Sequence, residues 1–203
     1  MPPKDKDNSW FALGETPYNA ELCSNGPIYL IGFMGAGKST LGRLLAEHLG
    51  YRFIDTDFFI ENRFRKKVSE LFATEGEERF RKKERVIIEE LSGFEHTVIS
   101  TGGGMPVFNN NLCEVMLTSG TVIYLQYTAQ ELATRLEVCK RTRPKVAHLS
   151  GSELQEYVTR ELSWRHPIYT QAHLTFFCDW QGCSLPETEL LSPLIRALNS
   201  LRK

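Results

Sequence analysis

The segment from residue 28 to residue 40 constrains the fold of this chain more than any other. It reads Ile-Tyr-Leu-Ile-Gly-Phe-Met-Gly-Ala-Gly-Lys-Ser-Thr, an apolar run that leads directly into G-x-x-x-x-G-K-S. A helix is expected over Thr40–Leu49, so the pattern is that of the strand, loop and helix of a P-loop. Glycines let the loop aim its backbone N–H groups inward, and the helix N-terminus adds positive potential. The chain is therefore predicted to bind a nucleoside triphosphate.

Individual loop residues have distinct expected roles. Lys38 is predicted to reach the β- and γ-phosphates, Ser39 to offer its hydroxyl to Mg²⁺, and Thr40 to make another phosphate contact. The alternative is a glycine-rich loop that matches by chance, and the strand before it and the helix after it argue against this. The residues expected to hold ATP at this loop are Gly35, Ala36, Gly37, Lys38, Ser39 and Thr40.

Composition narrows the class of protein. The 203 residues, 41% hydrophobic and 24% charged, suit one globular α/β domain. A formal net charge of −1 argues against a protein held on nucleic acid or on an acidic membrane by its overall field. The five cysteines lack C-x-x-C spacing, which favours a reducing compartment over a disulfide framework or a zinc site. No apolar stretch is typical of a signal peptide or a membrane span, so we expect a cytoplasmic protein without nucleic-acid or membrane partners.

Apolar runs and helical patterns alternate beyond the loop. Helices are predicted over Thr40–Leu49 and Glu77–Leu91. This alternation predicts an α/β fold, a three-layer α/β/α sandwich around a five-stranded parallel sheet. Ligands of such sheets bind beyond the carboxyl ends of the strands. The strands expected after the first one cover residues 52–55, 97–101, 121–127 and 173–178.

Residues 1–26 differ in composition from the rest of the chain. They are rich in Pro, Asp, Asn, Glu, Ser and Gly, with one apolar cluster, Trp10-Phe11-Ala12-Leu13. We predict an N-terminal extension in which this cluster is a candidate for docking on the domain and the remainder is flexible. Residues 27–203 then form the single nucleotide-binding domain.

Two carboxylates and three glycines stand where predicted strands end. Asp55 is a candidate magnesium-site carboxylate, and Asp57 a candidate to orient an attacking hydroxyl or to take its proton. The alternative for Asp57 is a helix N-cap, because Asp is a favoured cap. Residues 102–104 are all glycine, which predicts a bare backbone surface for a substrate, although an ordinary turn would also contain them.

Basic residues offer two further candidates. Arg81 follows the apolar Phe80 and stands three residues before Glu84, which can hold its guanidinium. The segment Lys140-Arg141-Thr142-Arg143-Pro144 opens a polar stretch that could close over a triphosphate as a lid, over about residues 138–152. An ordinary surface loop explains the same composition equally well.

The chain closely resembles the shikimate kinases from about Ile28 to Cys178. Besides the P-loop, the shared motifs are Asp55-Thr56-Asp57, Glu61, Gly76-Glu77 with Phe80-Arg81 and Glu84, Thr101-Gly102-Gly103-Gly104, Arg143-Pro144 and Arg165-x-Pro-x-Tyr169.

That resemblance implies a nucleoside-monophosphate-kinase-like fold with a mobile lid and a substrate-binding helical region at about 57–93. It implies ATP- and Mg²⁺-dependent phosphorylation of the 3-hydroxyl of shikimate, a step of aromatic amino-acid biosynthesis, and we expect a monomer. The implied residue roles are shikimate binding by Asp57, Arg81, Gly103, Gly104 and Arg165, catalysis by Lys38, Asp57 and Arg143, nucleotide contacts from Arg135 and Arg143, and support of Mg²⁺ by Ser39 and Asp55.

The chain departs from the family pattern at two places, and two other functions share part of its motifs. After Arg143-Pro144 the family usually has two leucines, where this chain has Lys145-Val146; the turn before Val68 also lacks the usual Gly and Ser. A related P-loop kinase for gluconate or a nucleoside monophosphate would share the loop, but the Phe80-Arg81 and triple-glycine set points away from it. A nucleotide-driven switch or regulator is a third possibility, and no N-K-x-D guanine-reading motif supports it.

Overall fold

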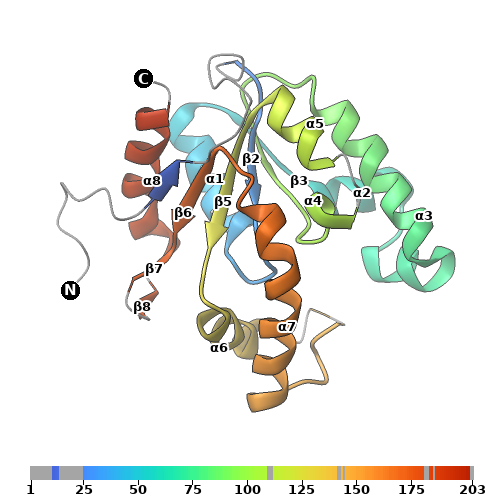
Figure 1. The fold of residues 1–203 in the computed structure, drawn as a ribbon. Helices are drawn as coiled ribbons and strands as arrows, with labels where there is room; N and C mark the ends of the chain where they lie inside the picture. Colours follow the sequence, from blue (N-terminus) through green and yellow to red (C-terminus); the bar gives the residue numbers. More distant parts are fainter. Residues whose placement is uncertain are drawn as a thin grey trace.

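The computed structural model describes residues 11–13, 25–108, 112–140, 143, 145–180, 183–184 and 186–201. A central six-stranded sheet runs through it, with helices on both faces (Figure 1). The spatial order is β1-β6-β5-β2-β4-β3, and a separate antiparallel pair is formed by β7 and β8. The strands are β1 (Phe11–Leu13), β2 (Ile28–Ile31), β3 (Arg52–Asp55), β4 (Thr97–Ser100), β5 (Thr121–Gln126), β6 (Leu174–Phe177), β7 (Asp179–Trp180) and β8 (Cys183–Ser184).

Five of these strands are parallel, as predicted. Strands β3, β4, β2, β5 and β6 pair in parallel along the sheet. Three of them are shorter than the apolar runs suggested, because the runs include the first residues of the following loops. The sixth strand, β1, pairs antiparallel with β6, so the apolar cluster of the N-terminal segment adds a strand to the edge of the sheet. The remainder of the predicted extension, residues 1–10 and 14–24, lies outside the described residues.

Both faces of the sheet are apolar because both are covered. Successive strand residues point to opposite faces. Leu30 of β2 packs in the cluster with Leu41 of α1 and Leu194 of α8, whereas its neighbour Tyr29 packs on the other face with Ile87 of α3. The helices are α1 (Lys38–Leu49), α2 (Thr56–Phe64), α3 (Val68–Leu91), α4 (Met105–Phe108), α5 (Leu112–Ser119), α6 (Ala129–Cys139), α7 (Gly151–Tyr169) and α8 (Glu187–Leu201).

Helix α3 is interrupted at Gly76. This residue has φ 80° and ψ 168°, a conformation that is strained for residues with a side chain. The predicted helix over Glu77–Leu91 is the part of α3 that follows the break. The ion pair between Lys83 and Glu75, with Nζ and Oε2 3.0 Å apart, spans the change of direction. The break therefore sets the direction of the second part of α3, from which the side chains of Glu77 and Arg81 project.

Strand β2 lies at the point where the chain reverses its direction of winding across the sheet. It pairs with β4 on one side and with β5 on the other. In open parallel sheets this is where ligands bind, outside the carboxyl ends of the strands. None of the helices among the described residues is both long and apolar enough to span a membrane.

Candidate active site

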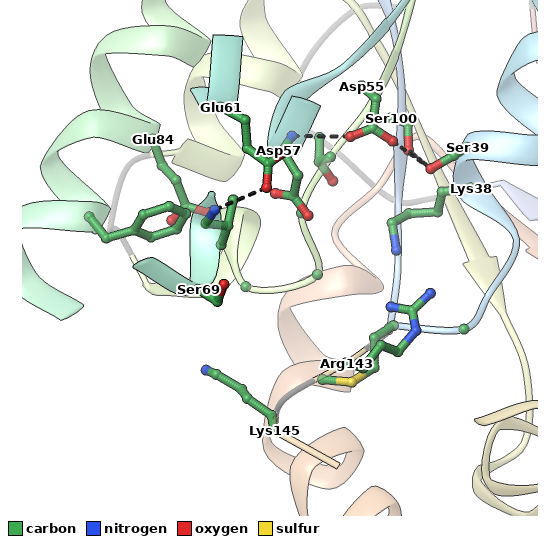
Figure 2. Close-up of a pocket in the computed structure, with 18 of the residues that line it drawn as sticks. Lys38, Ser39, Asp55, Asp57, Glu61, Ser69, Glu84, Ser100, Arg143 and Lys145 are labelled. Atoms are coloured by element: carbon green, nitrogen blue, oxygen red, sulfur yellow. Dashed lines mark hydrogen bonds between the residues drawn. The ribbon is translucent and has the colours of Figure 1, made fainter. Parts of the chain in front are cut away.

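One cavity of about 730 Å³ opens at the carboxyl ends of β2, β3 and β4. Its walls come from the P-loop, the starts of α2 and of the loop after β4, the middle of α3, Arg165 of α7 and the segment that carries Arg143 and Lys145 (Figure 2). Residues far apart in the sequence thus meet in one space. The predicted residues Asp57, Arg81 and Arg143 are all among the lining residues.

The P-loop is folded for anion binding. Gly35 and Gly37 have φ values of 86° and 76°, which glycine adopts readily and other residues rarely do. Lys38 is 8% exposed, and its Nζ donates to the carbonyl oxygens of Gly32 and Phe33 at 3.0 and 2.9 Å. Burial, with the nearby Arg143 charge, lowers the pKa of Lys38 to about 8. An anion that entered the cavity would restore the preference of Lys38 for its charged form.

Asp55 joins the P-loop to the end of β3. Its Oδ2 accepts a hydrogen bond from Ser39 Oγ at 2.5 Å, and Ser100 Oγ lies 3.3 Å from Ser39 Oγ (Figure 2). Its Oδ1 accepts from the backbone N–H groups of Asp57 and Phe58, so Asp55 is the N-cap of α2. The capping role considered for Asp57 therefore belongs to Asp55, and Asp57 lies in the first turn of the helix.

The oxygens around Ser39 suit a hard cation. Hydroxyl and carboxylate oxygens are the ligands that Mg²⁺ prefers, and Mg²⁺ at nucleotide sites takes few ligands from the protein. Across the described part of the chain, no group of three or more His, Cys, Asp or Glu side chains could hold a metal alone. This donor set fits an ion that would be shared with the phosphates of a nucleotide.

Asp57 projects into the centre of the cavity. Its side chain is exposed to the cavity, and partial desolvation of the carboxylate by the surrounding protein, together with the Asp55 charge, raises its pKa. A Cβ atom at Gly102 would lie 2.7 Å from Asp57 Oδ1, so a side chain at this position would displace the carboxylate. A carboxylate with a raised pKa accepts a proton more readily than an ordinary aspartate.

The other two glycines of the loop after β4 also admit close approach. A Cβ atom at Gly104 would lie 2.9 Å from Arg81 Nη1, and one at Gly103 would lie 3.3 Å from the Gly32 oxygen. The Tyr169 hydroxyl donates to the Gly103 carbonyl oxygen and so ties the end of α7 to this loop. The bare backbone surface predicted for residues 102–104 lines the cavity.

Arg81 is buried and held by two carboxylates. It is 8% exposed, with Nη1 2.6 Å from Glu84 Oε2 and Nη2 2.7 Å from Glu77 Oε1. Its guanidinium carbon lies 4.1 Å from the centroid of the Phe108 ring, a cation–π distance. Burial of Glu84, which is 1% exposed, raises its pKa to about 7 although Arg81 opposes the shift.

Arg165 reaches the same ring from α7. It is 3% exposed, its Nη2 lies 2.5 Å from Glu161 Oε2, and its guanidinium carbon lies 5.7 Å from the Phe108 centroid. Arg81 and Arg165 thus converge around one aromatic ring, although 84 positions separate them in the sequence (165 − 81). Two buried cations at one end of a cavity are suited to a carboxylate ligand.

Arg143 lies in the wall of the cavity, whereas Arg135 lies outside it beside the P-loop. Arg143 lines the cavity, and within the described residues its buried Nε has no hydrogen-bond partner. Arg135 is not among the lining residues; its Nε donates to the Gly35 oxygen at 2.9 Å, and its guanidinium pairs with Glu187 and lies 4.8 Å from the Tyr127 ring centroid. The predicted lid overlaps both neighbouring helices, since α6 extends to Cys139 and α7 begins at Gly151.

Several residues at the cavity were not predicted from the sequence. Ser100 was a detectable one, because it is a polar residue at the carboxyl end of a predicted strand. Phe108 carries no signal of its own, since an aromatic side chain near a helix end is usually core. Of the two residues that replace the usual leucines after Arg143-Pro144, Val146 is fully buried in the core, whereas Lys145 lines the cavity.

Comparison with known proteins identifies the family. The family model described as Shikimate kinase matches residues 34–183. The chain belongs to the shikimate kinase family. Among curated shikimate kinases, that of Parabacteroides distasonis is 49% identical over 149 residues, 73% of this chain and 86% of the relative. That of Phocaeicola vulgatus is 42% identical over 176 residues, 87% of this chain and 96% of the relative.

Solved shikimate kinases share the fold. The crystal structure from Bacteroides thetaiotaomicron has a TM-score of 0.78 at 39% identity, covering 85% of this chain and 98% of that one. The enzyme from Acinetobacter baumannii, solved in complex with shikimate, has a TM-score of 0.75 at 31% identity, covering 89% and 96%. A gluconokinase from Sinorhizobium meliloti has a TM-score of 0.53 at 20% identity, covering 89% and 95%, a likeness of fold alone.

Proposed function

We propose that this protein transfers the γ-phosphoryl group of ATP to the 3-hydroxyl of shikimate, giving shikimate 3-phosphate and ADP. One observation carries the proposal beyond family membership. A single cavity joins a P-loop to two buried arginines, with the Asp57 carboxylate between them. The arginine end suits a small acid, and the P-loop end suits a triphosphate.

We assign the chemical step to residues that line this cavity. The acceptor hydroxyl oxygen attacks the γ-phosphorus, the bond from that phosphorus to the β,γ-bridging oxygen breaks, and Asp57 takes the hydroxyl proton. Lys38 and Arg143 stabilise the charge that develops on the transferred group. Ser39 and Asp55 would hold Mg²⁺, which neutralises phosphate charge when bound. Arg135 is proposed to contact the adenine, from its position beside the P-loop.

Acceptor binding is assigned to the other end of the cavity. Arg81 and Arg165 hold the carboxylate, and Gly103 and Gly104 contact the ring through their backbone. The substrate-binding helical region predicted at about 57–93 corresponds to α2 and α3, which contribute Asp57 and Arg81 to the cavity. One chain supplies every residue assigned here, which supports a monomer as the working unit.

The direct test measures ADP release with shikimate, gluconate and nucleoside monophosphates supplied in parallel as acceptors. We expect robust release with shikimate alone, because gluconate lacks the ring proposed to contact the glycine surface and a nucleoside monophosphate has no carboxylate for Arg81 and Arg165 to hold. Release only with gluconate or with a nucleotide would end the proposal. ATP hydrolysis that is independent of every acceptor would favour a switch instead.

Loss of either carboxylate-binding arginine should weaken acceptor binding. Each charge-assisted bond is worth about 1.5–3 kcal/mol, so Arg81→Ala or Arg165→Ala should raise KM for shikimate by about 10- to 150-fold. KM for ATP should change little. Steady-state kinetics with each substrate varied in turn provide the measurement, with Arg85→Ala, an exposed arginine of α3, as the matched control. Equal affinity of the wild type for shikimate and its carboxamide would refute the carboxylate clamp.

Burial of Glu84 should make stability depend on pH. Burial raises the pKa of Glu84 to about 7 in the folded protein, above its ordinary value of 4.5 in the unfolded chain, so the folded state binds the extra proton between these values. The free energy of unfolding should therefore fall as pH rises from about 4.5 through 7, by up to about 3 kcal/mol from this group. Urea unfolding across this pH range should show a weaker decline in Glu84→Gln. An unchanged slope in that variant, matching the exposed control Glu78→Gln, would contradict the prediction.

A further inference from the structure

Lys145 occupies an unusual position two residues after Arg143. Its neighbour Val146 is fully buried and packs in the core, which anchors the segment beside the cavity. Lys145 itself is exposed and lines the cavity. Figure 2 shows the two cations entering different parts of it, Arg143 toward Lys38 and Lys145 toward the side of Glu84 and Ser69. The segment thus presents one positive charge to each end of the cavity.

The surroundings of Lys145 are those of the acid-binding end. Its Nζ lies 5.1 Å from the centroid of the Phe72 ring, and the Arg81 guanidinium carbon lies 5.4 Å from the same centroid. The Phe72 ring is itself stacked on Phe80 at 4.3 Å between centroids. The Lys145 charge contributes to lowering the pKa of Glu77 and opposes the rise in that of Glu84, and these carboxylates are the two that hold Arg81.

Lys145 also differs from the two arginines in its ionic partners. Arg81 is paired with two carboxylates and Arg165 with one. Within the described part of the chain, no carboxylate oxygen forms an ion pair with the Lys145 ammonium. An ammonium without a carboxylate partner retains its full attraction for an anion that enters the cavity. Arg81 and Arg165, in contrast, share their charges with carboxylates of the protein.

We propose that Lys145 is a specificity-determining residue, a third cation that favours an acceptor bearing a carboxylate over a neutral one. This rests on the proposed function, because it concerns the acceptor end of the same cavity. Lys145 acts on the charge of the acceptor and not on the phosphoryl group in transfer, which lies with Lys38 and Arg143 at the other end. Its removal should therefore change KM for the acceptor and leave kcat in place.

The test compares Lys145→Met, which removes the charge at similar length, with Lys145→Arg, which keeps it. The matched control is Lys82→Met, an exposed lysine of α3 that does not line the cavity. For Lys145→Met we expect KM for shikimate to rise about two- to fivefold, the range of an exposed charge pair. The values of kcat and of KM for ATP should stay within about twofold. Added salt should shrink the difference, because it screens exposed charges. Lys145→Arg should restore the wild-type KM.

A second readout isolates specificity. The ratio of KM for the shikimate carboxamide to KM for shikimate should fall in Lys145→Met and not in Lys82→Met. If the wild type phosphorylates shikimate and Lys145→Met keeps both KM and this ratio, the proposal for Lys145 is wrong and the proposed function stands. A fall in kcat with KM unchanged would equally overturn it, by placing Lys145 at the phosphoryl group. Failure of the wild type to phosphorylate shikimate would overturn both.

Discussion

Replacement of Asp57 by asparagine should preserve ATP binding and remove most of the turnover. General base catalysis contributes about 10²–10⁴-fold, and we expect a loss of kcat in that range. The amide keeps the size of the side chain but cannot take the hydroxyl proton. In the wild type, desolvation and Asp55 raise the pKa of Asp57 and so strengthen it as a base. A coupled assay of ADP release measures kcat, and calorimetry measures the affinity for ATP separately.

The local geometry indicates that this variant changes the carboxylate without disturbing α2. Asp55, and not Asp57, accepts the backbone hydrogen bonds that cap α2, so Asp57→Asn should leave the helix intact. Asp57→Glu is a useful companion, because it keeps the carboxylate but moves it into the space that the acceptor needs. If the Asp57→Asn variant retained more than half the wild-type kcat, Asp57 would have no part in proton transfer.

Replacement of Arg143 by alanine should lower kcat strongly and leave KM for shikimate nearly unchanged. Positioned arginines at transferring phosphoryl groups can be worth about 10³–10⁵ in rate, although Lys38 and Mg²⁺ could cover part of the loss. Arg143 lines the cavity on the side of Lys38 (Figure 2), and its charge acts on Lys38 and Asp57. In the proposed mechanism it stabilises charge that develops during transfer, and the acceptor carboxylate is bound by Arg81 and Arg165 instead. Single-turnover kinetics at saturating ATP would measure the chemical step itself.

Two comparisons make the result for Arg143 specific. Arg143→Lys keeps a charge without the planar guanidinium and should recover only part of the rate. Lys145→Met should show the reverse division, with KM altered and kcat retained. The lid expected over residues 138–152 stays a prediction, and hydrogen exchange in this segment should slow when nucleotide and shikimate bind together. Normal turnover in Arg143→Ala with unchanged exchange would mean that the segment is an ordinary surface loop.

Much of the fold was predictable because its signals are local. A P-loop needs a strand, a turn of glycines and a helix within about twenty residues, and all three are contiguous here. Alternating buried strands and helices then specify a parallel sheet, since such strands must be covered on both faces. Strand β1 escaped prediction because three residues that join a sheet edge show no periodicity. The break in α3 depends on the φ of Gly76, which a sequence pattern does not reveal.

The features of the site also separate into those that the sequence predicts and those that only the fold reveals. The sequence by itself determined the P-loop, the carboxylates of residues 55 and 57 and, through family motifs, which distant arginines are candidates for substrate binding, because these depend on residue type and spacing. Only the tertiary structure decided that Asp55 caps α2 while Asp57 projects into the cavity, and that Arg81 and Arg165 meet around Phe108. It alone placed Lys145 beside the Phe72 ring that Arg81 also approaches. Such contacts join residues many positions apart, and their geometry follows from how helices pack on the sheet.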